Sequence, residues 1–342
     1  MLITSQLIQW RAWVSCEGAS GRSMVPRLVF VHGVGKQHEL PKWDSWLASL
    51  EKGAKDAGHS SRVPSLLRSG ACDVRFAYYG DLFDRPETQG NPLEVAPDSS
   101  DETSGLYGML LEAVNERLAE NVDEHEVRHL KHAQSQLAPE GEAQGVCDIL
   151  RRVNVAANAL FHLPGLKRFG EWSSKRAMLG QLSQVQRYLA RKETGEDGLR
   201  IDERVRARVA KELDPSGPTI VVAHSLGTVV SFETLHEHAG PVPLFVTLGS
   251  PIGLRTAVQP RMRPQPLCVP PTVEHWLNVW DRDDLVVGSP HLEKWVAPSG
   301  TGVSPRNRRV DSDGAWVHPA IKYLGQPAVA GPILGALEGV SA

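Results

Sequence analysis

One serine of the chain stands in a segment that would expose its hydroxyl. Ser225 lies in the string Ala223-His224-Ser225-Leu226-Gly227, between a β-branched apolar run and a segment that favours a helix. Small residues two positions before and two after a serine allow a sharp strand-to-helix turn, in which bulkier side chains would collide. Ala in place of Gly at position 223 is conservative, because only the small size is needed. The string therefore predicts Ser225 as a nucleophile.

A serine nucleophile needs a base, and the base needs an orienting acid. Where such a turn occurs, the acid and then the histidine follow the serine along the chain. The string Asp281-Arg282-Asp283-Asp284 directly follows an apolar strand pattern, and open α/β sheets place their sites at the carboxyl ends of parallel strands. Asp284, just before the run Leu-Val-Val, is the predicted acid. Asp281 is the alternative, and Asp283 is expected to cap the turn.

The histidines considered as the base are His275, His291 and His318, all downstream of the serine. His275 precedes the acid at the start of a strand, and His291 follows Asp284 too closely to leave room for another strand. His318 stands before the last predicted helix, where Pro319 suits a first turn. His318 is therefore the predicted base, with His291 as the alternative.

Acyl transfer also needs N–H donors for the developing oxyanion. The Leu226 amide, at the start of the helix after Ser225, is one predicted donor. The other is the Val34 amide, with that of Gly35 as the alternative, because Gly33 and Gly35 let this backbone approach the site. His32 and His224 are expected to form supporting hydrogen bonds. The segment has neither the third glycine of a dinucleotide loop nor the Gly-Lys-Ser/Thr of a P-loop, so phosphate binding is not predicted.

Alternating strands and helices must position these residues. Apolar runs predict strands at 28–31, 74–79, 219–223, 244–248 and 276–280, and periodic segments predict helices at 43–50, at 226–236 and from about Pro319. This order predicts an α/β fold with a mostly parallel sheet and helices on both faces.

The sequence divides into an N-terminal extension at 1–25 and one α/β domain at 26–342. The extension lacks the basic start of a signal peptide, so a cytoplasmic location is expected. Within the domain, 85–200 is predicted to be a helical insertion, with a loop at 86–104 and helices at 106–118, 123–131, 147–163 and 180–192; a further helix at 201–213 leads back to the sheet. The apolar face at 149–161 is expected to pack against the sheet, and the alternative is a cover over a lipid site.

Composition excludes several classes. Among 342 residues, 37 Lys and Arg against 40 Asp and Glu leave a net charge of −3, so no nucleic-acid partner is predicted. The four cysteines form no C-x-x-C pair, so no metal, cofactor or disulfide framework is predicted. The basic residues Arg204, Arg206, Arg208 and Lys211 alternate with acids, which favours a solvated face over transient membrane-surface contact.

Five strings together resemble the α/β-hydrolase superfamily, especially its lipase-like serine esterases. They are VFVHGVGKQ, VVAHSLGTVVSF, VTLGSPIG, NVWDRDDLVV and WVHPAIKYL, in family order from about Arg27 to Leu324, with the insertion matching nothing. The resemblance implies an α/β-hydrolase fold, an oxyanion hole at Val34 and Leu226, and the triad Ser225, Asp284 and His318. It also implies that the string at 248–251, Leu-Gly-Ser-Pro, lines the site.

The expected function is hydrolysis of carboxylic esters or thioesters, with lipid-like or other small acyl substrates, through an acyl-serine intermediate. Acyl transfer with the same triad is an alternative, because only the acceptor differs. A non-catalytic binding module of the same fold is the alternative from another class. The sequence leaves the oligomeric state open.

Overall fold

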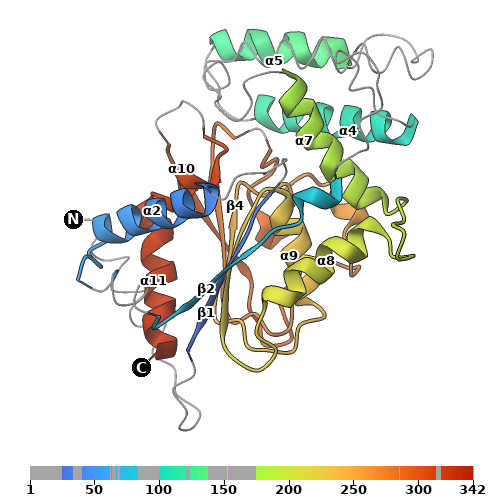
Figure 1. Cartoon of the computed structure of the whole chain (residues 1–342). Helices are drawn as coiled ribbons and strands as arrows, with labels where there is room; N and C mark the ends of the chain where they lie inside the picture. Colours follow the sequence, from blue (N-terminus) through green and yellow to red (C-terminus); the bar gives the residue numbers. More distant parts are fainter. Residues whose placement is uncertain are drawn as a thin grey trace.

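Within the residues that it describes, a computed structural model shows a six-stranded sheet in which all strands are parallel (Figure 1). The strand order is β2-β1-β3-β4-β5-β6, and the strands are β1 (Arg27–Val31), β2 (Asp73–Ala77), β3 (Thr219–His224), β4 (Phe245–Leu248), β5 (Trp276–Asp281) and β6 (Pro305–Val310). The structure describes residues 25–33, 41–61, 63, 67, 70–83, 100–119, 124–137, 152, 175–284, 286–312 and 317–341. The expected α/β class with a parallel sheet is confirmed.

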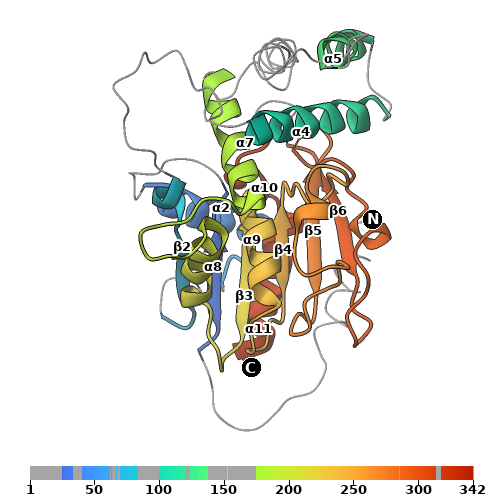
Figure 2. The ribbon, with the colours of Figure 1, turned by 90° about the vertical axis from the view of Figure 1, so that its right-hand side faces the viewer.

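Helices cover both faces of the sheet (Figures 1 and 2). One face carries α2 (Pro41–Asp56), α10 (Ala320–Leu324) and α11 (Pro327–Ser341), and the other carries α8 (Ile201–Glu212) and α9 (Leu226–Leu235). Alternate residues of β1 feed the two cores: Leu28 and Phe30 join the cluster with α2 and α11, whereas Val29 and Val31 join the cluster with α8 and α9. Because both faces are covered, β3 and β4 are buried along their whole lengths.

The strand order changes direction between β1 and β3. The chain leaves β1 toward β2 on one side, and it leaves β3 toward β4 on the other. Val31 of β1 pairs with Ala223 of β3, and His224 pairs with Leu248 of β4, so the carboxyl ends of these strands lie level. Loops that diverge at such a point open a crevice where α/β proteins bind ligands. Ser225 directly follows β3 at this point.

The described helices of the insertion lie beyond the carboxyl edge of the sheet (Figure 2). They are α4 (Ser100–Leu118), α5 (Glu124–Leu137) and α7 (Lys175–Ala190). Buried polar contacts join the end of α7 to the sheet-covering helices, because the Tyr188 hydroxyl donates to Glu233 of α9 at 2.7 Å. Arg191, just after α7, pairs with both Glu233 and Asp202 of α8. The predicted helix at 147–163 and residues 1–24 of the predicted extension lie outside the described residues, apart from position 152.

Two elements were not predicted. The strand β6 reads Pro-Arg-Asn-Arg-Arg-Val and lacks the apolar pattern of a strand. Among the described strands it pairs with β5 alone, at the edge of the sheet, where charged side chains can remain exposed. The helix α11 contains Pro332 and three glycines, which disfavour a helix by local propensity, yet most of its apolar side chains are buried against the sheet face. None of the described helices is both long and apolar enough to cross a membrane.

Candidate active site

The backbone at Ser225 has a conformation that residues with side chains rarely adopt. Its φ is 52° and its ψ is −128°, at the junction between β3 and α9. A Cβ atom at Gly227 would lie 2.3 Å from the His32 carbonyl oxygen, so α9 can approach β1 this closely only without a side chain there. Backbone strain such as that at Ser225 persists only where the surrounding structure enforces it, and it is typical of functional sites. The structure thus has the sharp turn that the sequence predicts.

Hydrogen bonds from two sides hold this turn. The Ser225 amide donates to the Leu248 carbonyl of β4 at 3.0 Å. The Ser225 carbonyl accepts from the amide and the hydroxyl of Thr228, at 2.9 and 2.7 Å. The hydroxyl of Ser250 lies 2.7 Å from that of Thr228, so the loop after β4 supports the same turn.

The structure brings the three predicted residues of the triad together. His318 Nε2 lies 3.2 Å from Ser225 Oγ, and His318 Nδ1 lies 2.8 and 3.0 Å from the two carboxylate oxygens of Asp284. Ser225, His318 and Asp284 are 3%, 4% and 5% exposed, so the chain of hydrogen bonds is shielded from water. This geometry lets the base accept the serine proton while the acid holds the ring.

The acid is positioned to stay ionised. Burial alone would raise the pKa of the Asp284 carboxyl, but the charge of His318 and the hydrogen bonds from His318, Tyr323 and the Val286 amide outweigh it, so that the pKa is lowered. The Tyr323 hydroxyl donates to Asp284 at 2.7 Å, and the Val286 amide donates at 3.1 Å. An ionised Asp284 accepts a hydrogen bond from the Nδ1–H of His318, which leaves the Nε2 lone pair facing Ser225.

The two other aspartates of this turn have structural contacts, and one expectation was wrong. The carboxylate of Asp281, the alternative acid, accepts hydrogen bonds from the amides of Asp283 and Ser312 at 2.9 and 2.8 Å. Asp281 therefore caps the turn, a role that was expected of Asp283. The Asp283 carboxylate instead pairs with Arg117 of α4 at 2.8 Å. Asp281 is the last residue of β5, so its side chain can reach the amide two residues on, as in an Asx turn.

The alternative base lies outside this cluster. His291 is half exposed and lies 3.4 Å from Glu293. The chain passes through β6 after His291 and returns to the acid only at His318.

His224 connects the nucleophile turn to the loop of the base. Its Nε2 donates to the His318 carbonyl at 2.7 Å, and the two rings lie 4.7 Å apart. Burial, followed by the charge of His318, lowers the pKa of His224 to about 3. A ring that stays neutral adds no positive charge beside His318. These contacts fit the supporting hydrogen-bond role that was expected of His224.

His32 supports the loop that follows β1. The Tyr79 amide donates to His32 Nε2 at 3.1 Å, and the Tyr79 hydroxyl donates to the His32 carbonyl at 2.5 Å. The two rings stack with their centroids 4.2 Å apart. These contacts hold the start of the Gly-rich loop in place.

Part of the predicted oxyanion hole lies in the described structure. Leu226 is the first residue of α9, and the first N–H groups of a helix have no partner within it, so they can bind an oxyanion. A Cβ atom at Gly33 would lie 2.6 Å from Ser225 Cβ, which shows how closely the loop after β1 approaches the serine. Val34 and Gly35 lie outside the described residues, so the second donor stays a prediction.

The string at 248–251 has a specific role in this geometry. Gly249 has a φ of +54°, and a Cβ atom there would lie 2.7 Å from Asp284 Oδ2 and 3.3 Å from His318 Nδ1. Any other residue would push the acid and the base apart. This agrees with the expectation that the string lines the site, and it explains why a glycine stands at this position.

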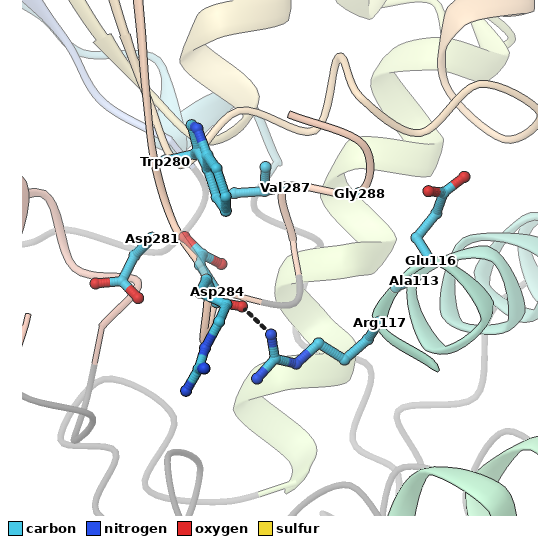
Figure 3. Close-up of a pocket in the computed structure, with 9 residues that line it drawn as sticks. Ala113, Glu116, Arg117, Trp280, Asp281, Asp284, Val287 and Gly288 are labelled. Atoms are coloured by element: carbon cyan, nitrogen blue, oxygen red, sulfur yellow. Dashed lines mark hydrogen bonds between the residues drawn. The ribbon is translucent and has the colours of Figure 1, made fainter. Parts of the chain in front are cut away.

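Sequence reasoning did not find Tyr323 or Arg117. Tyr323 lies within the string that carries His318, but nothing in that string marks its hydroxyl as a partner of the acid. Arg117 belongs to the insertion, and it faces a small hollow between α4 and the acid turn that Trp280 and Arg282 also line (Figure 3). Among the described residues, no group of three or more His, Cys, Asp or Glu could hold a metal ion.

Comparisons with known proteins do not assign this site. No family model, no curated protein and no solved structure matched the chain. Its interpretation therefore depends on the geometry and on the chemistry that the geometry allows.

Proposed function

We propose that the chain is a serine hydrolase of the α/β-hydrolase type that cleaves carboxylic esters or thioesters. One observation carries the proposal: Ser225 Oγ, the His318 ring and the Asp284 carboxylate form a continuous buried chain of hydrogen bonds at the carboxyl edge of a parallel sheet. A serine in a strained turn at the start of a helix, with a base and an oriented acid, is the arrangement that acyl transfer needs.

The reaction follows from the positions of these atoms. His318 Nε2 takes the Ser225 proton as Oγ attacks the acyl carbon, and the negative charge that develops on the carbonyl oxygen is stabilised by the Leu226 amide and by a second donor from the loop after β1. His318 then protonates the leaving alcohol or thiol, which leaves an acyl-Ser225. A water molecule that loses its proton to His318 releases the carboxylic acid and restores the serine. Asp284 keeps its charge throughout and stabilises the His318 cation.

The proposal includes lipid-like acyl substrates on the basis of the resemblance to lipase-like esterases. Acyl transfer to an alcohol or amine is the second candidate. It is favoured by the burial of the triad, because a site that excludes water lets another acceptor compete for the acyl-enzyme. A non-catalytic binding module is disfavoured, since binding alone would not require a strained serine aligned with a base and an acid.

A panel of 4-nitrophenyl esters from acetate to palmitate tests the proposal, with and without a short alcohol as acceptor. We expect turnover by the wild type, and a loss of about a thousandfold or more in kcat for Ser225→Ala without a change in the unfolding midpoint. Free acid as the product supports hydrolysis, whereas a new ester in the presence of the alcohol supports transfer. Equal rates for the wild type and Ser225→Ala would refute the proposal.

A further inference from the structure

The position of the catalytic acid depends on a short turn after β5. Asp284 lies three residues beyond Asp281, and the turn is closed by a hydrogen bond from the Asp284 amide to the Asp281 carbonyl at 3.2 Å. The Asp281 carboxylate, at the end of β5, also stabilises the turn because it accepts hydrogen bonds from the amides of Asp283 and Ser312. The two residues between Asp281 and Asp284 therefore determine where the acid points.

A side chain of the insertion holds both of these residues. Arg117, in the last turn of α4, donates one guanidinium N–H to the Arg282 carbonyl at 2.7 Å and another to the Asp283 carboxylate at 2.8 Å (Figure 3 shows the first of these bonds). Arg117 is 5% exposed, so water competes weakly for these bonds. The planar guanidinium makes two bonds in fixed directions and so sets the orientation as well as the position of the turn.

The helix that carries Arg117 is itself fixed to the neighbouring loop. Glu112 is buried, and its carboxylate accepts hydrogen bonds from the amides of Thr256 and Ala257 and from the Thr256 hydroxyl, at 2.8 to 3.1 Å. One turn further along α4, Glu116 pairs with Arg255 at 2.9 Å. The helix α4 thus connects the loop after β4 to the acid turn after β5, and a movement of α4 away from the sheet would break both sets of bonds.

We infer that Arg117 is a positioning residue for Asp284 and that α4 is a fixed part of the catalytic frame rather than a cover that must open. This inference builds on the proposed function, because it gives Arg117 the role of positioning the acid of the proposed triad. The opposite interpretation predicts an effect of opposite sign. If α4 were a cover held shut by Arg117, loss of the arginine would open the site and make Ser225 more reactive.

The rate at which a fluorophosphonate probe labels Ser225 distinguishes a positioning role of Arg117 from a role in holding a cover shut. The probe forms an Oγ–P bond, fluoride leaves, and the serine proton passes to His318, so no substrate needs to be known. Saturation kinetics give a maximal labelling rate, kinact, and a concentration constant, KI. For Arg117→Gln we expect kinact to fall by about tenfold or more with KI unchanged, because a small displacement of a catalytic group is costly. A faster reaction or a lower KI would overturn the inference, as would an unchanged kinact.

Two further variants keep the test decisive. Arg208→Gln removes an exposed arginine of α8 that pairs with Asp81 rather than with the acid turn, and its kinact should stay within about twofold of the wild type. Arg117→Lys retains the charge without the planar pair of donors, so its kinact should lie between those of Arg117→Gln and the wild type. If Arg117→Gln does not fold, a kinact of Arg117→Lys equal to that of the wild type overturns the inference. Failure of the wild type itself to label Ser225 would instead refute the proposed function.

Discussion

Tyr323 and Tyr188 are fully buried tyrosines that each donate a hydrogen bond to a carboxylate, and the Tyr323 hydroxyl also accepts one from the Asp281 amide at 3.2 Å. Each hydroxyl donates to a buried carboxylate at 2.7 Å, Tyr323 to Asp284 and Tyr188 to Glu233. Burial, followed by the charge of the neighbouring carboxylate, raises the pKa of each phenol well above its ordinary value, so each keeps its proton and remains a donor. Only the first of the two carboxylates orients the base of the proposed triad.

The pair provides a test at the level of single residues. Tyr323→Phe keeps the ring but removes a hydrogen bond to a charged group, so we expect kcat for ester hydrolysis to fall by about tenfold with little change in KM. Both substitutions should lower the free energy of unfolding by a similar amount, about 1–3 kcal/mol. Tyr188→Phe should nevertheless leave kcat within about twofold of the wild type. Kinetics and urea unfolding of both variants check this. Equal losses of kcat in the two variants would show that the effect comes from stability alone.

The contrast between the triad and its supporting residues shows what a sequence can reveal about a site. Ser225, Asp284 and His318 could be selected because each stands in a local pattern whose chemistry is known. Arg117 and Tyr323 act on the same turn from positions 165 and 39 residues away from their partners, and no local pattern records such contacts. The wrong assignment of the turn cap to Asp283 has the same origin, because Arg117, the partner of Asp283, lies on α4.

At the level of secondary structure, the close packing of α9 against β1 predicts how glycine substitutions change the free energy of unfolding. A Cβ atom at Gly227 would lie 2.3 Å from one backbone oxygen and 2.7 Å from another, whereas a Cβ atom at Gly335, in α11, would meet nothing within 4 Å. Gly227→Ala should therefore lower the free energy of unfolding by about 1–3 kcal/mol. Gly335→Ala should raise it by up to about 1 kcal/mol, because alanine favours a helix over glycine.

Urea unfolding of the two variants measures both effects. Gly227→Ala should also lose most of its ester hydrolysis, since the backbone oxygens that would have to move belong to Val31 and His32, beside the nucleophile turn. A Gly227→Ala variant as stable and as active as the wild type would contradict the packing described for α9.

The strands and helices could be predicted from the sequence where apolar residues form a continuous run or recur with the period of a helix. The strands β1, β3, β4 and β5 are buried runs and could be predicted to within about a residue. The strand β2 was predicted two residues too far, because Tyr78 and Tyr79 leave the sheet and stack on His32. At β6, edge exposure removes the apolar period, and at α11, burial against the sheet outweighs the unfavourable proline and glycines.

At the level of the whole molecule, the site is assembled from segments that span most of the sheet. In the proposed triad, the nucleophile Ser225 follows β3, the acid Asp284 lies in the turn after β5, and the base His318 precedes α10. The proposed support of the acid comes from Tyr323 of α10 and from Arg117 of α4. The predicted insertion at 85–200 is therefore joined to the catalytic frame through α4, and through the end of α7 to α8 and α9. Its apolar segment at 149–161 lies outside the described residues, apart from position 152. The expected packing of this segment against the sheet therefore stays a prediction, with a cover over the site as the alternative.

The proposed function depends above all on the activation of Ser225 by His318 and Asp284. Peptide mass spectrometry of the full chain after fluorophosphonate treatment tests it most directly, with Ser225→Ala and His318→Ala as controls. We expect a single adduct on the peptide that contains Ser225, absent in Ser225→Ala and formed much more slowly in His318→Ala. Folded wild-type protein that forms no adduct, or that forms it equally well without His318, would contradict it.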